Sequence, residues 1–466
     1  MRGGRVGVSM RIFLALVLFV ALATLLWNAA AAPPDWASSK NAVTIYDPDP
    51  NHLWNQLHAV FFVRDDLPGT ERMPDVLDPP LWYHTSYLLT RPSHNRALRV
   101  LDQFLQTHAE NLIHDPVRRA ILQRDLWAVF DWAVERQPGR RGEPAYEKEK
   151  TELQTRLAEI LRRLALSPEQ IASLPDNYAE AVASGEFARE YDPAHRQRAF
   201  LPPDLFDPHG PWVELEDPGN PDPIAFQHFS NFSARSSFLT FLRLPEGRKA
   251  TFDYLQTLWD FPERWVALPS GMGPNFPEAK RRDLPQFPAG TEVALVRQMT
   301  LFDNQGKLIN SPITESLQIR VYREIVQSDR AAAGSDRSGQ DFYDIHLSRP
   351  QLFAGKAGGL RSVRPDEKDF SKFGASGPDV GKPAQYARLD QYAPILETCV
   401  MCHQQPGIYS FSSRDKLLKP HALQKDRASD SYGPRWWQEA RTLAWKQNHG
   451  DWAALTAYWK TNATRP

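Results

Sequence analysis

Five consecutive residues toward the C-terminal end, Cys399-Val400-Met401-Cys402-His403, combine two thiols with an imidazole. Two cysteines three residues apart project to the same side of a helical turn, where each thiol could form a thioether with one vinyl-derived arm of a porphyrin. The histidine that follows would lie beneath the iron, with Nε2 as the proximal ligand and Nδ1 donating to a nearby backbone carbonyl. The spacing therefore predicts one covalently bound haem c, with Cys399, Cys402 and His403 as the cofactor-binding residues.

The motif contains both cysteines of the 466-residue chain, so no thiol remains for a disulfide or for a second set of soft metal ligands. A zinc site is the alternative, but it would require further histidines or carboxylates as ligands. These five residues resemble the attachment site of c-type cytochromes, and residues 381–466 resemble more loosely the class I members, which pair the motif-bearing helix with a terminal helix. This resemblance implies a helical haem module and an electron-transfer function.

Several residues are candidates for the ligand on the opposite face of the iron, because class I cytochromes usually use a methionine downstream of the motif and this chain has no methionine after Met401. His421 follows a proline in a loop that could bend over the ring, and Met272 lies in a glycine-containing loop that could deliver a thioether. His449 is expected at a helix end, where a cation is favoured without any metal role, and Met299 is expected in the core. An empty sixth position is a further possibility. Two protein ligands would suit electron transfer, whereas an open position would permit small-ligand binding or peroxide chemistry.

Three functions follow from these alternatives. The first is an exported mono-haem c-type cytochrome, an electron carrier or redox subunit rather than an enzyme, whose redox partner the sequence does not specify. The second is a haem enzyme or small-ligand sensor with an open sixth position, and the third is an envelope binding protein with a structural haem. Nothing in the chain resembles a basic nucleic-acid footprint, since its formal net charge is -1.

The N-terminus has the pattern of an export signal. Arg2, Arg5 and Arg11 precede the apolar run 12–27, and small residues follow at 29–32. We expect cleavage near Ala31 and a location in the periplasm or cell envelope. An uncleaved segment would instead act as a membrane anchor, and only then is membrane association expected.

The pattern of elements predicts a helix-rich α+β protein. The expected divisions are a signal peptide (1–31), a mainly helical region (32–190), a mixed α/β region with loops (191–380) and a haem c module (381–466). Apolar residues recur at helical spacing within 92–114, 116–130 and 153–164, and a capping box begins at Ser167. Alternating and β-branched runs predict strands at 292–303, 317–322 and 342–347, and the short run 60–63 is also strand-like. Helices are expected to begin at 394, 434 and 451.

Five tryptophans lie in the final 31 residues. They are Trp436, Trp437, Trp445, Trp452 and Trp459. Their helical spacing predicts a packing core, and some of them are expected to wall in the porphyrin.

Overall fold

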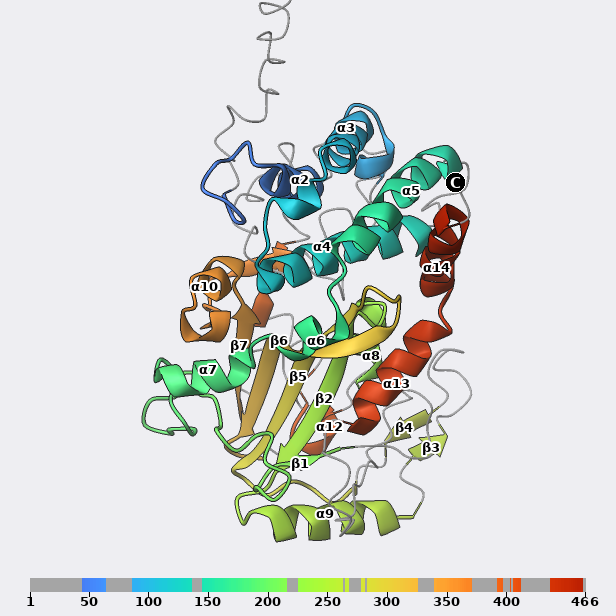
Figure 1. Ribbon diagram of the computed structural model, residues 1–466. Helices are drawn as coiled ribbons and strands as arrows, with labels where there is room; N and C mark the ends of the chain where they lie inside the picture. The colour runs from blue at the N-terminus through green and yellow to red at the C-terminus, as the bar shows by residue number, and fades with distance from the viewer. Residues whose placement is uncertain are drawn as a thin grey trace, which may run out of the picture.

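The computed structural model describes residues 44–63, 86–135, 145–215, 225–262, 265–267, 278–280, 283–325, 339–370, 392–396, 403, 405–411 and 436–463. These residues form a mixed structure in which helices pack on both faces of an antiparallel sheet (Figure 1). The α+β class expected from the sequence is confirmed at this general level. The expected signal peptide lies outside the described residues, and none of the described helices is long and apolar enough to span a membrane.

The central sheet has the strand order β1-β2-β5-β6-β7-β8, and every neighbouring pair is antiparallel. Its strands are β1 (Val213–Glu214), β2 (Ser236–Arg243), β5 (Thr291–Phe302), β6 (Leu308–Tyr322), β7 (Gln340–Leu347) and β8 (Leu360–Ser362). The three predicted strands are thus confirmed as β5, β6 and β7. The turn between β5 and β6 is built locally, since Asp303 Oδ1 accepts hydrogen bonds from the backbone N–H groups of Gln305 and Lys307 and Gly306 adopts a positive φ of 77°.

A layer of helices covers one face of the sheet. It contains α4 (Pro116–Glu135), α6 (Pro168–Ala172) and α7 (Asn177–Ser184), while α5 (Glu147–Leu164) packs on α4 and α3 (Ser93–Gln106) packs on α5. The predicted helices and the capping box at Ser167 are confirmed. Asp115 caps α4 by accepting from the N–H groups of Val117 and Arg118. Because α4 contacts α5 on one side and β5 on the other, most of its circumference is buried.

The strand-like run 60–63 is a misprediction, because Val60, Phe61 and Phe62 belong to helix α2 (Leu53–Phe62). The helix packs against α3 and α4 and is buried on almost every side. Because even Asn55, Gln56 and His58 are buried, the helix has no exposed polar face. Its apolar end at 59–63 does not distinguish a buried helix from a strand.

Within the proline-rich region between residues 191 and 290, the described chain includes β2 and two helices. These are α8 (Phe226–Asn231) and α9 (Arg248–Asp260), and the latter lies at the end of the sheet farthest from α2 (Figure 1). The remaining short elements are η3 (Tyr87–Leu89), η4 (Ala109–Asn111), β3 (Trp265–Ala267), β4 (Glu278–Lys280), α10 (Arg349–Phe353), η5 (Ala357–Gly359), β9 (Lys368–Phe370) and β10 (Tyr392–Pro394).

The C-terminal elements are α12 (Ile408–Phe411), α13 (Trp436–Gln447) and α14 (Gly450–Ala463). Helix α13 contacts β2 and β6, whereas α14 contacts α4 and α5. Trp459 donates its indole N–H to the carbonyl of Ala158, at 2.8 Å, and Trp452 packs against Trp127. These contacts attach the last two helices to the same helix-and-sheet core as the N-terminal helices. Of the expected helix at 394, residues 395, 396 and 403 are helical and the residues between them lie outside the described chain.

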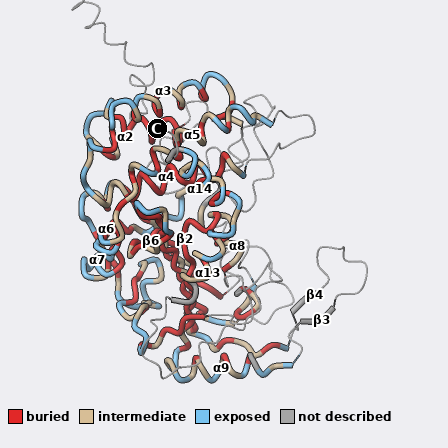
Figure 2. Tube along the Cα trace, turned by 45° about the vertical axis from the view of Figure 1, so that its right-hand side comes forward, coloured by how far each residue is buried: buried red, intermediate tan, exposed pale blue. Residues whose placement is uncertain are grey.

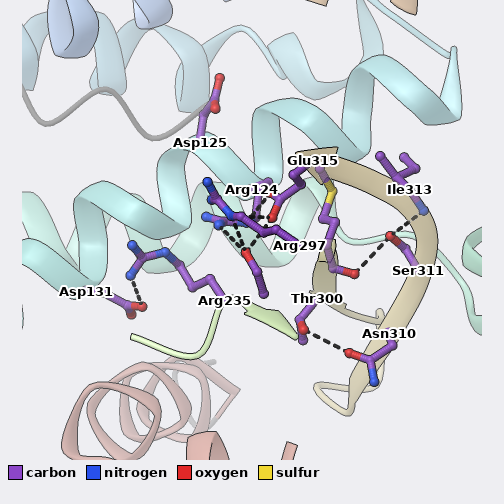
Figure 3. A network of polar contacts seen from close by, with 12 residues as sticks. Arg124, Asp125, Asp131, Arg235, Arg297, Thr300, Asn310, Ser311, Ile313 and Glu315 are labelled. Carbon is purple, nitrogen blue, oxygen red and sulfur yellow. Dashed lines mark hydrogen bonds and ion pairs between the residues drawn. The ribbon is translucent and has the colours of Figure 1, made fainter. Parts of the chain in front are cut away.

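A buried ionic network joins α4 to the sheet (Figure 3). Glu315 of β6 pairs with Arg124 of α4 and Arg297 of β5, at 3.2 and 2.9 Å. Both arginines also donate to Ser236 Oγ of β2. Buried residues are concentrated in α4 and the central strands, while α3 and α9 present exposed surfaces (Figure 2). Because buried charges require specific partners, the network fixes how α4 lies across the three strands.

Candidate haem site

His403 is the described residue of the predicted attachment motif, since Cys399 and Cys402 lie outside the described chain. It is half-buried and helical, and it lies beside the start of β7. The side-chain amide of Gln340 donates to the backbone carbonyls of His403 and Gln405, at 3.2 and 2.9 Å. These two bonds hold the backbone on both sides of residue 404 against the sheet.

The imidazole of His403 is oriented by a backbone carbonyl, as the motif predicts for a proximal ligand. Its Nδ1 lies 2.7 Å from the carbonyl oxygen of Ser410 in α12. Because a carbonyl can only accept, Nδ1 carries the proton, and in the neutral ring Nε2 is then the basic nitrogen. This is the tautomer that a haem iron requires of its axial histidine.

Ser410 is itself fixed by β6 and by the turn that precedes α12. Arg320 donates to the Ser410 carbonyl and to its hydroxyl, at 3.3 and 3.2 Å, and the Tyr322 hydroxyl lies 2.7 Å from Ser410 Oγ. Gly407 has a positive φ of 52°, and a Cβ there would overlap the side chain of Gln286. The carbonyl that orients His403 is therefore held by a buried, multiply bonded residue.

A second histidine faces this ring from a distant part of the sequence. The ring centres of His228 and His403 are 6.2 Å apart, and their planes are within 8° of parallel. His228 belongs to α8, which packs against β2, where its ring lies 5.9 Å from that of Phe238. The next residue, Phe229, packs edge-on against Trp445 of α13 at 4.9 Å.

The environment of His228 favours the neutral imidazole. Burial, together with the nearby positive charge of Arg320, lowers the pKa of His228 to about 4, although Asp344 acts in the opposite direction. The residue nevertheless keeps some solvent-accessible surface, although it lies deep in the protein. A histidine that is largely enclosed yet retains accessible surface is suitably placed to meet a bound group.

The sheet beneath the two histidines includes side chains that are only partly buried. Leu295 of β5, Gln318 of β6 and Phe342 of β7 have intermediate exposure although their strands lie in the interior of the sheet. Leu295 pairs directly with Gln318, and Gln318 pairs with Asp344, two residues from Phe342. The described elements therefore leave a contiguous part of this face incompletely covered.

Of the four residues considered as distal ligands, two lie within the described chain and two do not. His421 and Met272 lie outside the described residues. Met299 is fully buried in the main hydrophobic core, as expected. His449 follows α13, where its ring stacks on Trp445 at 4.2 Å and its Nδ1 lies 3.2 Å from Asp451. It thus has the ordinary polar role that its helix-end position suggested.

The C-terminal tryptophans serve mainly as packing residues among the described side chains. Trp452 and Trp459 pack against Phe302 in the helical core. Trp445 instead packs against Phe229 of α8, the residue that follows His228. The side chains of Trp436 and Trp437 are outside the described set.

Glu135, His449 and Asp451 form a cluster whose ligand atoms lie within 4.8 Å of one another. The ammonium of Lys446 already lies 2.7 Å from Asp451 and 2.6 Å from Asp131. A protein cation thus neutralises the charge that would attract a metal ion, and the arrangement is better described as an ionic cluster that is buried at Asp451 and exposed at Glu135.

The sequence offered little to identify His228. It is one of thirteen histidines, and its only local distinction is a phenylalanine on the C-terminal side and another two residues before it. No family model, curated protein or solved structure matches this chain. The evidence for the candidate site is therefore the geometry of His403, Ser410 and His228 together with the spacing of the two cysteines.

Proposed function

We propose that this chain is an exported mono-haem c-type cytochrome that carries electrons. The haem would be bound through thioethers to Cys399 and Cys402, with His403 as the proximal iron ligand. Bound iron would supply one-electron chemistry by alternating between the ferric and ferrous states. The observation that carries the proposal is the 2.7 Å contact between His403 Nδ1 and the Ser410 carbonyl, because it presents the basic Nε2 of the histidine that follows the two cysteines.

The residues around His403 support this role by fixing it. Gln340 holds its backbone, and Ser410 holds its ring. A ligand held in one orientation needs little reorganisation when the charge of the iron changes, which suits electron transfer. Arg320, buried beside Ser410, would favour the ferrous state because it disfavours additional positive charge nearby.

The proposal also includes the finer organisation expected from the sequence. Residues 381–466 would contribute a cytochrome-like haem module, the N-terminal segment would direct export to the periplasm or envelope, and the extension before residue 380 would bury the haem and recognise a redox partner protein. The contacts of α13 with β2 and of α14 with α4 favour a module that is integrated with the rest of the chain.

Covalent haem attachment is the decisive test. The full-length chain should be produced in a bacterial host with an active cytochrome c maturation system and fractionated. The expected product is periplasmic, contains one iron per chain, retains haem under denaturing conditions, and gives the pyridine haemochrome spectrum of a haem with two thioethers. The variant C399S/C402S should lose covalent haem. A wild-type protein that carries no covalent haem in a host that matures a control cytochrome would refute the proposal.

A further inference from the structure

We propose that His228 is the second axial ligand, so that the haem iron is bound between His228 and His403. This inference rests on the proposed function, because it requires that the chain carry the haem. It identifies the sixth ligand that the motif leaves open, and it selects a histidine that lies 175 positions earlier in the chain than His403.

The spacing of the two rings is the first argument. Metal–imidazole bonds are roughly 2 Å long, so two imidazoles on opposite sides of one metal have ring centres about 6 Å apart. The observed separation is 6.2 Å, with planes within 8° of parallel. Rings in direct stacking contact lie closer, as Trp445 and His449 do at 4.2 Å in the same structure. His228 and His403 are therefore separated by the distance that a shared iron requires.

The second argument is that the two histidines are anchored to different strands. His228 belongs to α8, which packs on β2, and its ring lies beside that of Phe238 on this strand. His403 is tied through Ser410 to β6. Strand β5 lies between β2 and β6, and neighbouring strands are about 4.8 Å apart. The two anchors are thus roughly 10 Å apart, which leaves room for a flat group between the rings.

The third argument is the sheet surface between these anchors. Leu295 projects from β5 and Gln318 from β6, and both retain accessible surface. A porphyrin is a large, mostly apolar body, and covering these partly exposed side chains would bury apolar area at about 25 cal/mol per Å². A bound porphyrin would therefore account both for the incompletely covered face of the sheet and for the separation of the two rings.

Two histidine ligands would make the iron six-coordinate and low-spin, with neither face open to external ligands. This favours electron transfer over the sensor or peroxide-type chemistry that an open position would permit. The role of α8 is then to deliver an iron ligand, and its packing against Trp445 of α13 positions that ligand.

Spectroscopy of the wild-type holoprotein tests the ligand pair without any substitution. We expect ferric electron paramagnetic resonance and near-infrared magnetic circular dichroism of a low-spin iron with two nitrogen ligands, and a ferrous absorption spectrum that carbon monoxide leaves unchanged. A sulfur-to-iron charge-transfer band would indicate a thioether such as Met272 and would overturn the inference. A high-spin spectrum would indicate an open position and would also overturn it.

Substitution then identifies the histidine. His228→Ala should keep the covalent haem but become high-spin, bind carbon monoxide at least tenfold faster, and regain a low-spin spectrum when imidazole is added. His346→Ala is the matched control, because His346 lies on β7, the strand next to β6, and its Nε2 pairs with Asp344 at 3.0 Å. It should leave the spectrum unchanged, as should His421→Ala.

Each failure has a distinct signature. If wild-type protein carries no covalent haem, the proposed function fails before the ligand question arises. If His228→Ala holds haem and remains low-spin and insensitive to carbon monoxide, His228 is not the ligand. Should His228→Ala be too unstable to isolate, His228→Met retains a side chain of similar size, and it should introduce the sulfur-to-iron band. A His228→Met protein with the wild-type spectrum would overturn the inference as well.

Discussion

Lys446 links the last two helices to α4 through a buried ionic cluster, and Lys446→Met should strongly destabilise the fold. Its ammonium lies 2.6 Å from Asp131 and 2.7 Å from Asp451, and all three side chains are fully buried. At an effective dielectric constant of about 20, each attraction is roughly 6 kcal/mol before desolvation is counted. Removing one partner of such a buried set typically costs about 3–5 kcal/mol, because the remaining charges are left unpaired.

We expect a loss in the lower part of that range, about 3 kcal/mol in the free energy of unfolding. Asp131 would keep Arg235 at 2.7 Å, and Asp451 would keep His449 at 3.2 Å. Lys446 also lies 5.0 Å from the ring centre of Trp127. A methionine would retain this apolar packing, so the experiment removes mainly the charge.

The measurement is chemical denaturation of the wild-type and variant holoproteins, followed by circular dichroism and tryptophan fluorescence. Lys249→Met is the matched control, because Lys249 lies at the same 2.6 Å from Asp253 but its side chain is 87% exposed. Exposed pairs are worth about 0–1 kcal/mol. If the two variants lose equal stability, burial does not decide the strength of this interaction and the reasoning is refuted.

The pH dependence gives an independent check. Burial and the neighbouring Asp451 already raise the pKa of Asp131 above its ordinary value, and removing Lys446 would raise it further. A carboxyl whose folded pKa exceeds its unfolded pKa contributes stability below the unfolded value, and that contribution is lost as the pH rises through the folded value. The loss of unfolding free energy caused by Lys446→Met should therefore be larger at pH 8 than at pH 4. A loss that does not vary with pH would contradict the assigned charges.

Three further substitutions test other parts of the structure. Burial raises the pKa of Glu292 to about 7, so its contribution to stability is complete below its unfolded pKa and is lost as the pH rises through about 7. Glu292→Gln should remove this pH dependence and raise the free energy of unfolding at pH 8 by up to about 3 kcal/mol in denaturation curves. An unchanged pH profile of stability would contradict this account. Gly358→Ala should lower the free energy of unfolding by about 3 kcal/mol or more, because its Cβ would overlap a backbone carbonyl. Gly355 also has a positive φ but nothing lies within 4 Å of its Cβ position, so Gly355→Ala should cost about 1–2 kcal/mol. Equal losses of stability in the two variants would refute the steric account. Arg320→Met removes a buried cation bonded to Ser410 and should lower the haem midpoint potential in a redox titration, whereas Arg320→Lys should retain most of it; a potential that does not change would remove Arg320 from this role.

Local patterns predicted the elements whose chemistry is local. The helices α3 and α5 each expose one face and bury the other, so their apolar residues recur at helical spacing. The β5–β6 hairpin was predictable because the turn that joins its strands is closed by Asp303 and Gly306 from within the same few residues. The capping box at Ser167 is equally local.

The failures occurred where burial or distance removes the local signal. Helix α2 is buried on almost all sides, its polar residues included, so it has no exposed polar face and its short apolar end resembles a strand. Helix α8 has six residues in a proline-rich region, which is too short for periodicity to be detected.

For the candidate site, the sequence by itself determined the pair of thiols and the adjacent histidine, because the proposed covalent attachment would require these groups at a fixed spacing along the chain. It also determined that no methionine follows the motif. The tertiary structure alone decided that His228 faces His403 at 6.2 Å. That relation depends on β2 and β6 lying on either side of β5, and on α8 and α12 packing over their respective strands. The physical reason is that a ligand from a distant segment needs only to be delivered to the right point in space, and no spacing along the chain constrains where it comes from.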